Sequence, residues 1–411
     1  PGAKYGIPFP VLIRSSFGPV GAHIPTMIRA LVACGWFGIQ TWIGGKALAF
    51  LAVTAFPSVS LPQFLPDFFG ISTGQFLAFL VFWAMNVAII VRGIEALKVF
   101  ETLAAPFLLL TGLALFIWAW WKVPGGFDAM MTDASPKGPE APSMSTFSAL
   151  GIGITVAVSF WGTLALNIPD FTRYARSQKD QAIGQAISLP TTMTFYVFIG
   201  AAVTNATILI FGERIAEPVE LLSQVGGPVV VVIAMLGLVV ATLSTNLAAN
   251  VVSPANALVN LSPQRISFRL GSLLTAALGV AIFPWKLIES SSGYIFTWLI
   301  GYSVLLGPIG GILIVDYYLL RRTRLEAAAL YRHDVPYVYR NVYNWRAFAA
   351  LFVGVAPYVV GFLAAAGLVS SVPALFATIY TYALFVGLAL AGLVYWGLIR
   401  LMPPAAEDGD G

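Results

Sequence analysis

Long apolar stretches separated by short polar breaks run along nearly the whole chain. Residues 221–264 and residues 347–399 contain no Asp, Glu, Lys, Arg or His. Because a membrane-spanning helix needs about 20 apolar residues, the first stretch is long enough for one span and the second for two. The pattern predicts an all-α integral membrane protein, with ten spans near residues 22–53, 74–92, 99–121, 148–169, 188–212, 227–253, 267–286, 293–320, 347–369 and 374–401.

The composition of the chain is also typical of a membrane protein. Of the 411 residues, 58% are hydrophobic and 10% are charged, and the mean hydropathy is +0.85. Soluble domains carry about 25% charged residues, so the composition excludes a water-soluble protein. The formal net charge of +4 is explained by Lys and Arg in cytoplasmic loops and does not indicate a nucleic-acid partner.

The basic residues predict the orientation in the membrane. If residues 1–21 are cytoplasmic, most of the 22 Lys and Arg residues fall in loops on that side, as the positive-inside rule requires. Ten spans then place both termini of this chain in the cytoplasm, and we expect a monomeric, multi-pass protein of the cytoplasmic (plasma) membrane. The chain begins at Pro1 without an initiator methionine, so we also expect a preceding segment to be missing.

Two predicted spans carry polar side chains that lipid-facing positions would not favour. Trp36 and Gln40 lie four residues apart and therefore on one helix face, where an indole plane beside a carboxamide suits a planar, amide-bearing heterocycle. Asn246 and Asn250 repeat this spacing in a later span. The alternative is that the tryptophan anchors at the membrane interface and the amides only tie helices together.

Hydroxyls beside these asparagines form a candidate cation site. Ser244, Thr245 and the carbonyl of Ala241 supply oxygen ligands, which suit a hard cation such as Na⁺. The alternative is that the hydroxyls bond back to their own helix.

The span near 148–169 contains Gly151, Gly153, Ser159 and Gly162 beside Trp161. Glycines weaken a helix, and broken transmembrane helices expose backbone groups that hold substrates near mid-membrane. Close helix packing is the simpler explanation of the glycines, but the neighbouring tryptophan favours a site.

Two further segments are candidate gates. Asp170 follows Pro169 at the end of the same span and either contributes to an inner gate or lies at a solvated helix end. Gly307 and Pro308 interrupt a later span, where they form either a hinge or a kink that neighbouring helices tolerate.

Few residues are suited to catalysis or metal binding. The chain has one cysteine, Cys34, and two histidines, His23 and His333, so neither an intrachain disulfide nor a zinc or haem site is expected. Asp170 and Asp316 have no evident His or Cys partner for nucleophilic chemistry. The sequence therefore predicts no enzyme and no cofactor.

With these residues in hand, the chain resembles the nucleobase-cation-symport-1 family of permeases, and its motifs are most like those of the allantoin and uracil branch. The resemblance runs from residue 4 to the final hairpin. Its most specific motifs are residues 14–18 (RSSFG), 35–44 (GWFGIQTWIG), 167–170 (NIPD) and 244–254 (STNLAANVVSP).

The resemblance implies a five-plus-five inverted-repeat fold of twelve spans, of which this chain holds the third to the twelfth and lacks the first two. It divides the chain into the remainder of repeat one (1–122, three spans), an outer loop (123–147), repeat two (148–320, five spans), a cytoplasmic loop (321–346) and a two-span hairpin with its tail (347–411).

The resemblance also implies roles for individual residues. In the family's hydantoin transporter two tryptophans sandwich the ligand while a glutamine and an asparagine bond its edge, and these positions match Trp36, Trp161, Gln40 and Asn250. Phe160 stands where that transporter has a glycine, so the pocket shape differs here. The family's sodium site matches Ala241, Ser244 and Thr245, with its remaining ligands on a first helix outside this sequence.

Together these observations predict a secondary active transporter. It would import a neutral planar amide heterocycle, such as allantoin, uracil, hydantoin or a related nucleobase, by alternating access and symport of Na⁺ or H⁺. The alternatives are an amino-acid permease of the same fold, a nonfunctional fragment of a transporter, and a membrane enzyme.

Overall fold

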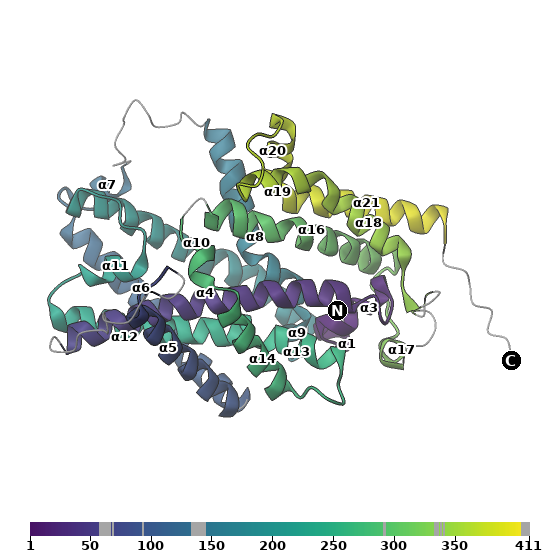
Figure 1. Ribbon diagram of the computed structural model, residues 1–411, viewed down its shortest axis with the longest axis horizontal. Helices are drawn as coiled ribbons and strands as arrows, with labels where there is room; N and C mark the ends of the chain where they lie inside the picture. Colours follow the sequence, from purple (N-terminus) through teal and green to yellow (C-terminus); the bar gives the residue numbers. More distant parts are fainter. Residues whose placement is uncertain are drawn as a thin grey trace. The chain divides into compact units, whose positions relative to one another are not determined.

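The computed structural model describes residues 1–56, 67, 70–92, 94–132, 145–290, 293–332, 337, 339 and 342–403. These residues form helices and connecting turns, with no extended strand among them (Figure 1). The longer helices are α4 (His23–Ala55), α5 (Thr73–Arg92), α6 (Ile94–Lys122), α8 (Thr146–Asn167), α10 (Gln178–Phe211), α12 (Pro228–Asn250), α13 (Val252–Leu261), α14 (Phe268–Ala281), α16 (Ile300–Ile314), α18 (Trp345–Val355) and α21 (Ala383–Leu401).

Shorter helical segments connect and extend these helices. Two of them, η1 (Gly293–Leu299) and η2 (Val315–Leu320), are π-helical and flank α16. The others are α1 (Gly2–Tyr5), α2 (Phe9–Leu12), α3 (Arg14–Phe17), α7 (Gly126–Met131), α9 (Pro169–Thr172), α11 (Pro218–Ser223), α15 (Pro284–Leu287), α17 (Ala327–Arg332), η4 (Ala356–Tyr358), α19 (Val359–Ala365) and α20 (Ala374–Thr381).

Eight segments of the described chain are long and apolar enough to cross a membrane. The predicted first span, in α4, is not among them, because Gln40, Thr41 and Lys46 interrupt its apolar run. Helix α14 has 14 residues and is also too short. The chain is thus an all-helical membrane protein, while the count of ten spans stays a prediction. The eight segments are Thr73–Arg92, Thr102–Lys122, Ala149–Asn167, Gln178–Phe211, Pro228–Leu261, Gly293–Leu320, Trp345–Ala365 and Ala383–Leu401.

The chain forms two compact units, each assembled from segments far apart in sequence. The first unit comprises Pro1–Trp36, Met144–Gln181 and Val251–Gly411, and the second comprises Phe37–Ser143 and Ala182–Asn250. Helix α4 is therefore shared, with Trp36 ending one portion and Phe37 beginning the other. The inverted-repeat boundaries read from the sequence stay a prediction.

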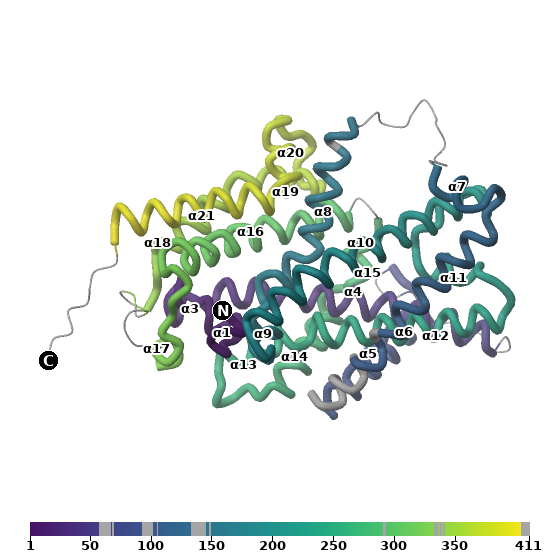
Figure 2. Tube along the Cα trace, turned by 180° about the vertical axis from the view of Figure 1, so that it is seen from behind, coloured from purple at the N-terminus to yellow at the C-terminus, as the bar shows by residue number. Residues whose placement is uncertain are grey.

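In the first unit, α16, α18 and α21 lie side by side (Figures 1 and 2). A Cβ atom on Gly307 would lie 2.6 Å from the backbone oxygen of Leu384, and one on Gly311 would overlap the backbone of Leu388. Helix α16 runs through Pro308 without ending. These small residues therefore let helix backbones approach closely, and a gating role for Gly307 and Pro308 stays a prediction.

The N-terminal residues of the first unit are held by a buried ionic network around Asp316. Arg321 donates to the Asp316 carboxylate through Nε at 2.8 Å and to the Ser15 carbonyl through Nη2 at 2.7 Å. Asp316 also accepts from Ser15 Oγ at 2.9 Å and from the Tyr395 hydroxyl at 3.1 Å. Burial opposes the charge of Arg321, but attraction to Asp316 outweighs it and raises its pKa above the ordinary value.

In the second unit, the later part of α4 packs closely on α5. Any side chain on Gly44 would overlap the ring of Phe82, and a Cβ on Gly45 would lie 2.6 Å from the backbone of Phe79. Helix α6 packs along α12 in the same unit (Figure 2). The glycines of α4 thus bring its backbone against a neighbouring helix at the level of the predicted polar site.

Candidate functional site

Aromatic side chains surround Trp36 in the first unit. The Trp36 ring, 6% exposed, meets the rings of Phe160, Tyr294, Trp298 and Tyr302 at centroid distances of 5.3, 6.1, 6.2 and 6.5 Å. All four contacts are edge-on, with interplanar angles of 66° to 89°. Edge-to-face contacts are favourable for aromatic pairs, so these neighbours fix the plane of the Trp36 indole.

Local sequence explains why these rings can converge. Tyr294, Trp298 and Tyr302 recur every fourth residue along η1 and α16, which places them on one side of that segment. Gly35 leaves room beside α4 because any Cβ there would overlap the Trp298 indole. The Tyr302 hydroxyl donates to the Ser159 carbonyl of α8 at 2.7 Å. The π-helical turn of η1 lies in this cluster, and such turns often occur at functional sites.

The same cluster contains polar atoms that other side chains do not satisfy. Phe160 also contacts its sequence neighbour Trp161 edge-on at 5.9 Å, whereas the rings that meet Trp36 do not include Trp161. The sandwich of a ligand between Trp36 and Trp161 therefore stays a prediction. The buried Nε1 atoms of Trp161 and Trp298 and the Oγ atom of Ser159 have no hydrogen-bond partner. Native proteins rarely leave buried polar atoms unpaired, so the cluster offers donors to a polar ligand as well as ring faces.

Amide side chains form a separate cluster in the second unit. Asn246, fully buried, shares its Nδ2 hydrogens among the Phe37 carbonyl at 3.2 Å, Thr41 Oγ1 at 3.1 Å and Asn86 Oδ1 at 3.2 Å. Asn250 donates to Asn246 Oδ1 at 3.1 Å. Asn246 is therefore committed to joining α4, α5 and α12, whereas Asn250 is the member with capacity left for a ligand.

This division of roles predicts different effects for the two asparagines. We expect Asn246→Ala to lower the free energy of unfolding by about 2 kcal/mol, because it removes several hydrogen bonds of about 0.6 kcal/mol each, including the one that Asn86 Oδ1 accepts. Asn250→Ala removes one such bond, so we expect a loss of about 0.6 kcal/mol. Unfolding of the purified protein in detergent measures both, and equal losses would contradict the assignment.

The remaining predicted ligand residues lie on helices of the second unit. Gln40, on α4, is half-buried. On α12, Ser244 is buried, Ala241 is half-buried and Thr245 is exposed. Ala241 lies one helical turn before both hydroxyls, three residues from Ser244 and four from Thr245, and only one of these hydroxyl side chains is buried. Their binding of Na⁺ stays a prediction, as does the convergence of both clusters on one ligand.

Asp170 is buried, so a solvated helix end does not describe it. Its oxygens accept from the Phe9 backbone N–H at 2.9 Å and from Ser253 Oγ at 2.7 Å, which joins α9 to α2 and α13. Burial raises the pKa of this carboxyl, and the hydrogen bonds together with Arg29 and Arg173 oppose the increase. Asp170 ties three segments of the first unit together, and its gating role stays a prediction.

Sequence reasoning missed several participants. Asn86 lies in the predicted span near residues 74–92. An amide side chain in an apolar helix indicates a hydrogen-bond partner on another helix, as the amide of Asn246 does. The four-residue spacing of Tyr294, Trp298 and Tyr302 was a second signal, but aromatic residues are common in apolar helices. Among the described residues no group of three His, Cys, Asp or Glu side chains is placed to hold a metal ion.

Comparison with known proteins defines the class of protein to which this fold and these clusters belong. Residues 1–387 match the family model described as permease for cytosine/purines, uracil, thiamine, allantoin. The chain is 46% identical over 398 residues to the purine-uracil permease NCS1 of Arabidopsis thaliana, covering 96% of this chain and 65% of that protein. It is 38% identical to the allantoin permease of Bacillus subtilis (strain 168), covering 98% of this chain and 80% of that protein.

Solved structures show the same fold. The structure of Mhp1, a nucleobase-cation-symport-1 family transporter, in a closed conformation with bromovinylhydantoin bound, matches with a TM-score of 0.72 and 25% identity. The match covers 97% of this chain and 80% of that one.

The chain belongs to the family of permeases for cytosine/purines, uracil, thiamine and allantoin. The resemblance of its motifs to the nucleobase-cation-symport-1 permeases is thereby confirmed. The matched relatives are named as permeases rather than enzymes.

Proposed function

We propose that this protein imports a neutral, planar, amide-bearing heterocycle across the cytoplasmic membrane by alternating access. The candidate substrates are allantoin, uracil, hydantoin and related nucleobases. The observation that carries the proposal is the aromatic cluster, in which Trp36 is held by four edge-on rings beside unpaired donors. A fixed indole plane favours a flat ring, because stacking requires parallel faces.

The amide residues supply the discrimination in this proposal. Gln40 lies one helical turn from Trp36 on α4 and can bond the edge of a ring that stacks on the indole. Asn250 retains hydrogen-bonding capacity beyond its bond to Asn246. A site built to bond substrate amides rejects analogues that lack them, because its own polar groups are then left unpaired.

Cation coupling belongs to the same proposal. Ala241, Ser244 and Thr245 would hold part of a Na⁺ site on α12, and proton coupling is the alternative. The ion must bind the outward-open and inward-open states with different affinity, because an ion with equal affinity for both shifts no equilibrium. Both termini of this chain would be cytoplasmic, as the distribution of Lys and Arg predicts, and the protein would act as a monomer.

Uptake into proteoliposomes tests the substrate class directly. We expect radiolabelled uracil, allantoin or hydantoin to accumulate intact, and unlabelled members of this group to compete with the transported compound. Amino acids should not compete, because an aromatic and amide site lacks paired charges for a carboxylate and an ammonium. Competition by amino acids, or chemical conversion of the ligand, would replace the proposal with a rival. Repeating the assay without Na⁺ and without a proton gradient identifies the coupling ion.

A further inference from the structure

We infer that Arg29 and Asn167 form a second binding station for substrate, where buried donors receive a carbonyl oxygen of the heterocycle after it leaves the aromatic cluster. The inference rests on the proposed function, since it concerns the route of the same substrate. It gives a role to Arg29, which takes no part in the proposed stacking on Trp36 or in the bonding of the ring edge by Gln40 and Asn250.

The two side chains are fully enclosed and only partly satisfied. Arg29 is 1% exposed and Asn167 is 0% exposed. Arg29 donates through Nη2 to Asn167 Oδ1 at 2.8 Å and through Nε to the Thr163 carbonyl at 3.4 Å. Arg29 Nη1 and Asn167 Nδ2 have no hydrogen-bond partner. Arg29 Nη1 belongs to the same guanidinium as the donor atom Nη2, and Asn167 Nδ2 belongs to the same carboxamide as the acceptor atom Oδ1. The two unused donors therefore lie close together, beside the hydrogen bond that joins the two residues.

The surrounding charges favour a neutral acceptor over an anion. No carboxylate in the described part of the chain lies within ion-pair distance of Arg29. Asp170 attracts Arg29 electrostatically, but its own oxygens already accept from Phe9 and Ser253. An anion at the unused donors would be repelled by Asp170, whereas a urea or imide carbonyl meets both donors without adding charge.

The station lies on the same seam between α4 and α8 as the aromatic cluster. Trp36 of α4 meets Phe160 of α8, while Arg29, earlier in α4, bonds Thr163 and Asn167, later in α8. The helices therefore run antiparallel along this seam. Arg29 lies seven residues before Trp36, which is about 10 Å along the helix. In the proposed orientation this displacement points toward the cytoplasm, where substrate leaves.

Transport measured from each side of the membrane tests the station. We would use right-side-out and inside-out membrane vesicles, with whichever of radiolabelled uracil, allantoin or hydantoin the wild type transports. Arg29→Lys keeps the charge but loses the planar fork, and Asn167→Ala removes the second donor. For Arg29→Lys we expect the half-saturation concentration from the cytoplasmic side to rise about tenfold, the effect of one hydrogen bond to a charged group, and for Asn167→Ala about fivefold, the effect of one neutral hydrogen bond. From the outside it should change less than about twofold.

Asn344→Ala is the matched control. It removes buried hydrogen bonds to the Ser16 carbonyl and the Tyr395 hydroxyl in the same unit and touches neither Arg29, Asn167 nor Asp170, so it should affect both sides equally. Equal shifts from both sides in the Arg29 and Asn167 variants would overturn the inference and assign these residues to stability. No shift in either would also overturn it, and would indicate donors satisfied by a structural water.

A wild-type measurement covers the case in which these variants fail to fold. Thiocarbonyl analogues of the transported heterocycle accept hydrogen bonds weakly, so they should lose more potency as inhibitors from the cytoplasmic side than from the outside. Equal loss on both sides would contradict the station. If the wild type transports none of the three heterocycles, the proposed function itself fails, which is a distinct result.

Discussion

Uptake of the preferred heterocycle is expected to require about five- to 150-fold more substrate for half-saturation when Trp36 is replaced by alanine. Stacking of a base-like ring on an aromatic side chain is worth about 1–3 kcal/mol, and each 1.4 kcal/mol corresponds to a tenfold change in affinity. The substitution also removes the ring around which Phe160, Tyr294, Trp298 and Tyr302 are arranged. Radiolabelled uptake measured over a range of concentrations gives the value.

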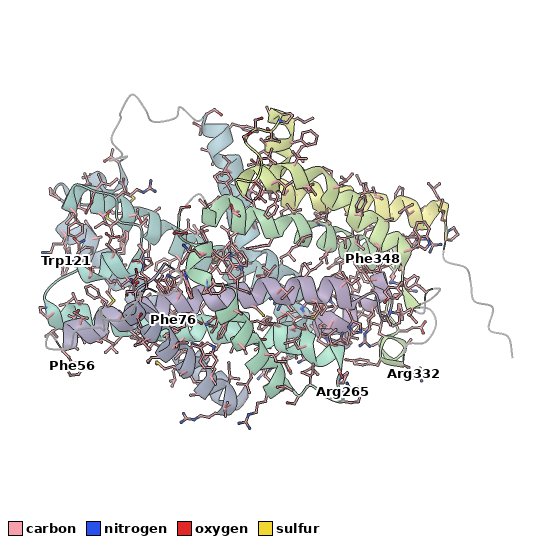
Figure 3. All side chains as sticks on the ribbon, in the orientation of Figure 1. Phe56, Phe76, Trp121, Arg265, Arg332 and Phe348 are labelled. Atoms are coloured by element: carbon pink, nitrogen blue, oxygen red, sulfur yellow. The ribbon has the colours of Figure 1, made fainter. Side chains whose placement is uncertain are left out.

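Companion variants separate stacking from general damage. Trp161→Ala, Gln40→Ala and Asn250→Ala are expected to weaken uptake in the same direction, whereas Trp36→Phe should retain part of the stacking. Trp121, 82% exposed and labelled in Figure 3, provides a control in which an indole is lost from the surface. Trp121→Ala should therefore leave half-saturation unchanged. Membrane insertion of every variant is checked by its yield in the membrane fraction. Unchanged half-saturation in all four alanine variants would remove Trp36 and its companions from the binding site.

The sequence predicted the helical membrane fold well because that prediction depends on composition and length alone. A segment such as Pro228–Leu261 must cross hydrocarbon as a helix to satisfy its backbone groups. The prediction is harder to confirm for α4, where the polar side chains of Gln40, Thr41 and Lys46 reduce the mean hydropathy that identifies a span. Polar residues within a membrane helix thus weaken the sequence signal of that helix.

The sequence predicted that Asn246 and Asn250 are buried polar residues, but it did not predict their hydrogen-bond partners. Spacing on one helix grouped Asn246 with Asn250 and suggested equivalent roles. Their different hydrogen bonds depend on Asn86 and Thr41, which come from other helices. Because local sequence spacing does not reveal which helices pack together, it could not separate the structural amide from the candidate ligand.

Glycines gave a similar ambiguity. Gly307 and Pro308 appear in the sequence as a possible hinge, because both residue types weaken a helix. The structure shows a continuous α16 whose glycines accommodate the backbone of α21. A hinge and a packing surface favour the same residue type, so the close packing on α21 explains the glycines while the hinge stays a prediction.

The second large expected effect concerns stability, at the ionic network of Asp316. We expect Asp316→Asn to lower the free energy of unfolding by about 3–5 kcal/mol, because removing one member of a buried pair leaves the other charge uncompensated. The Asp316 side chain is 2% exposed and that of Arg321 is 18% exposed, so water screens the remaining charge only weakly. Thermal unfolding of the purified protein in detergent would show the loss as a reduced melting temperature.

A double-mutant cycle identifies the pair as the cause. Asp316→Asn combined with Arg321→Gln should destabilise less than the sum of the two single changes, because the double variant buries no unpaired charge. The Lys286 and Glu289 pair, with side chains 49% and 65% exposed, is the matched control, and Glu289→Gln should have no measurable effect. Strict additivity at Asp316 and Arg321 would mean that the two side chains stabilise separate segments, Asp316 through Ser15 and Tyr395 and Arg321 through the Ser15 carbonyl. Both Asp316 and Arg321 hydrogen-bond Ser15. Either result would therefore show whether the ion pair or the separate hydrogen bonds hold the N-terminal residues of the first unit in place.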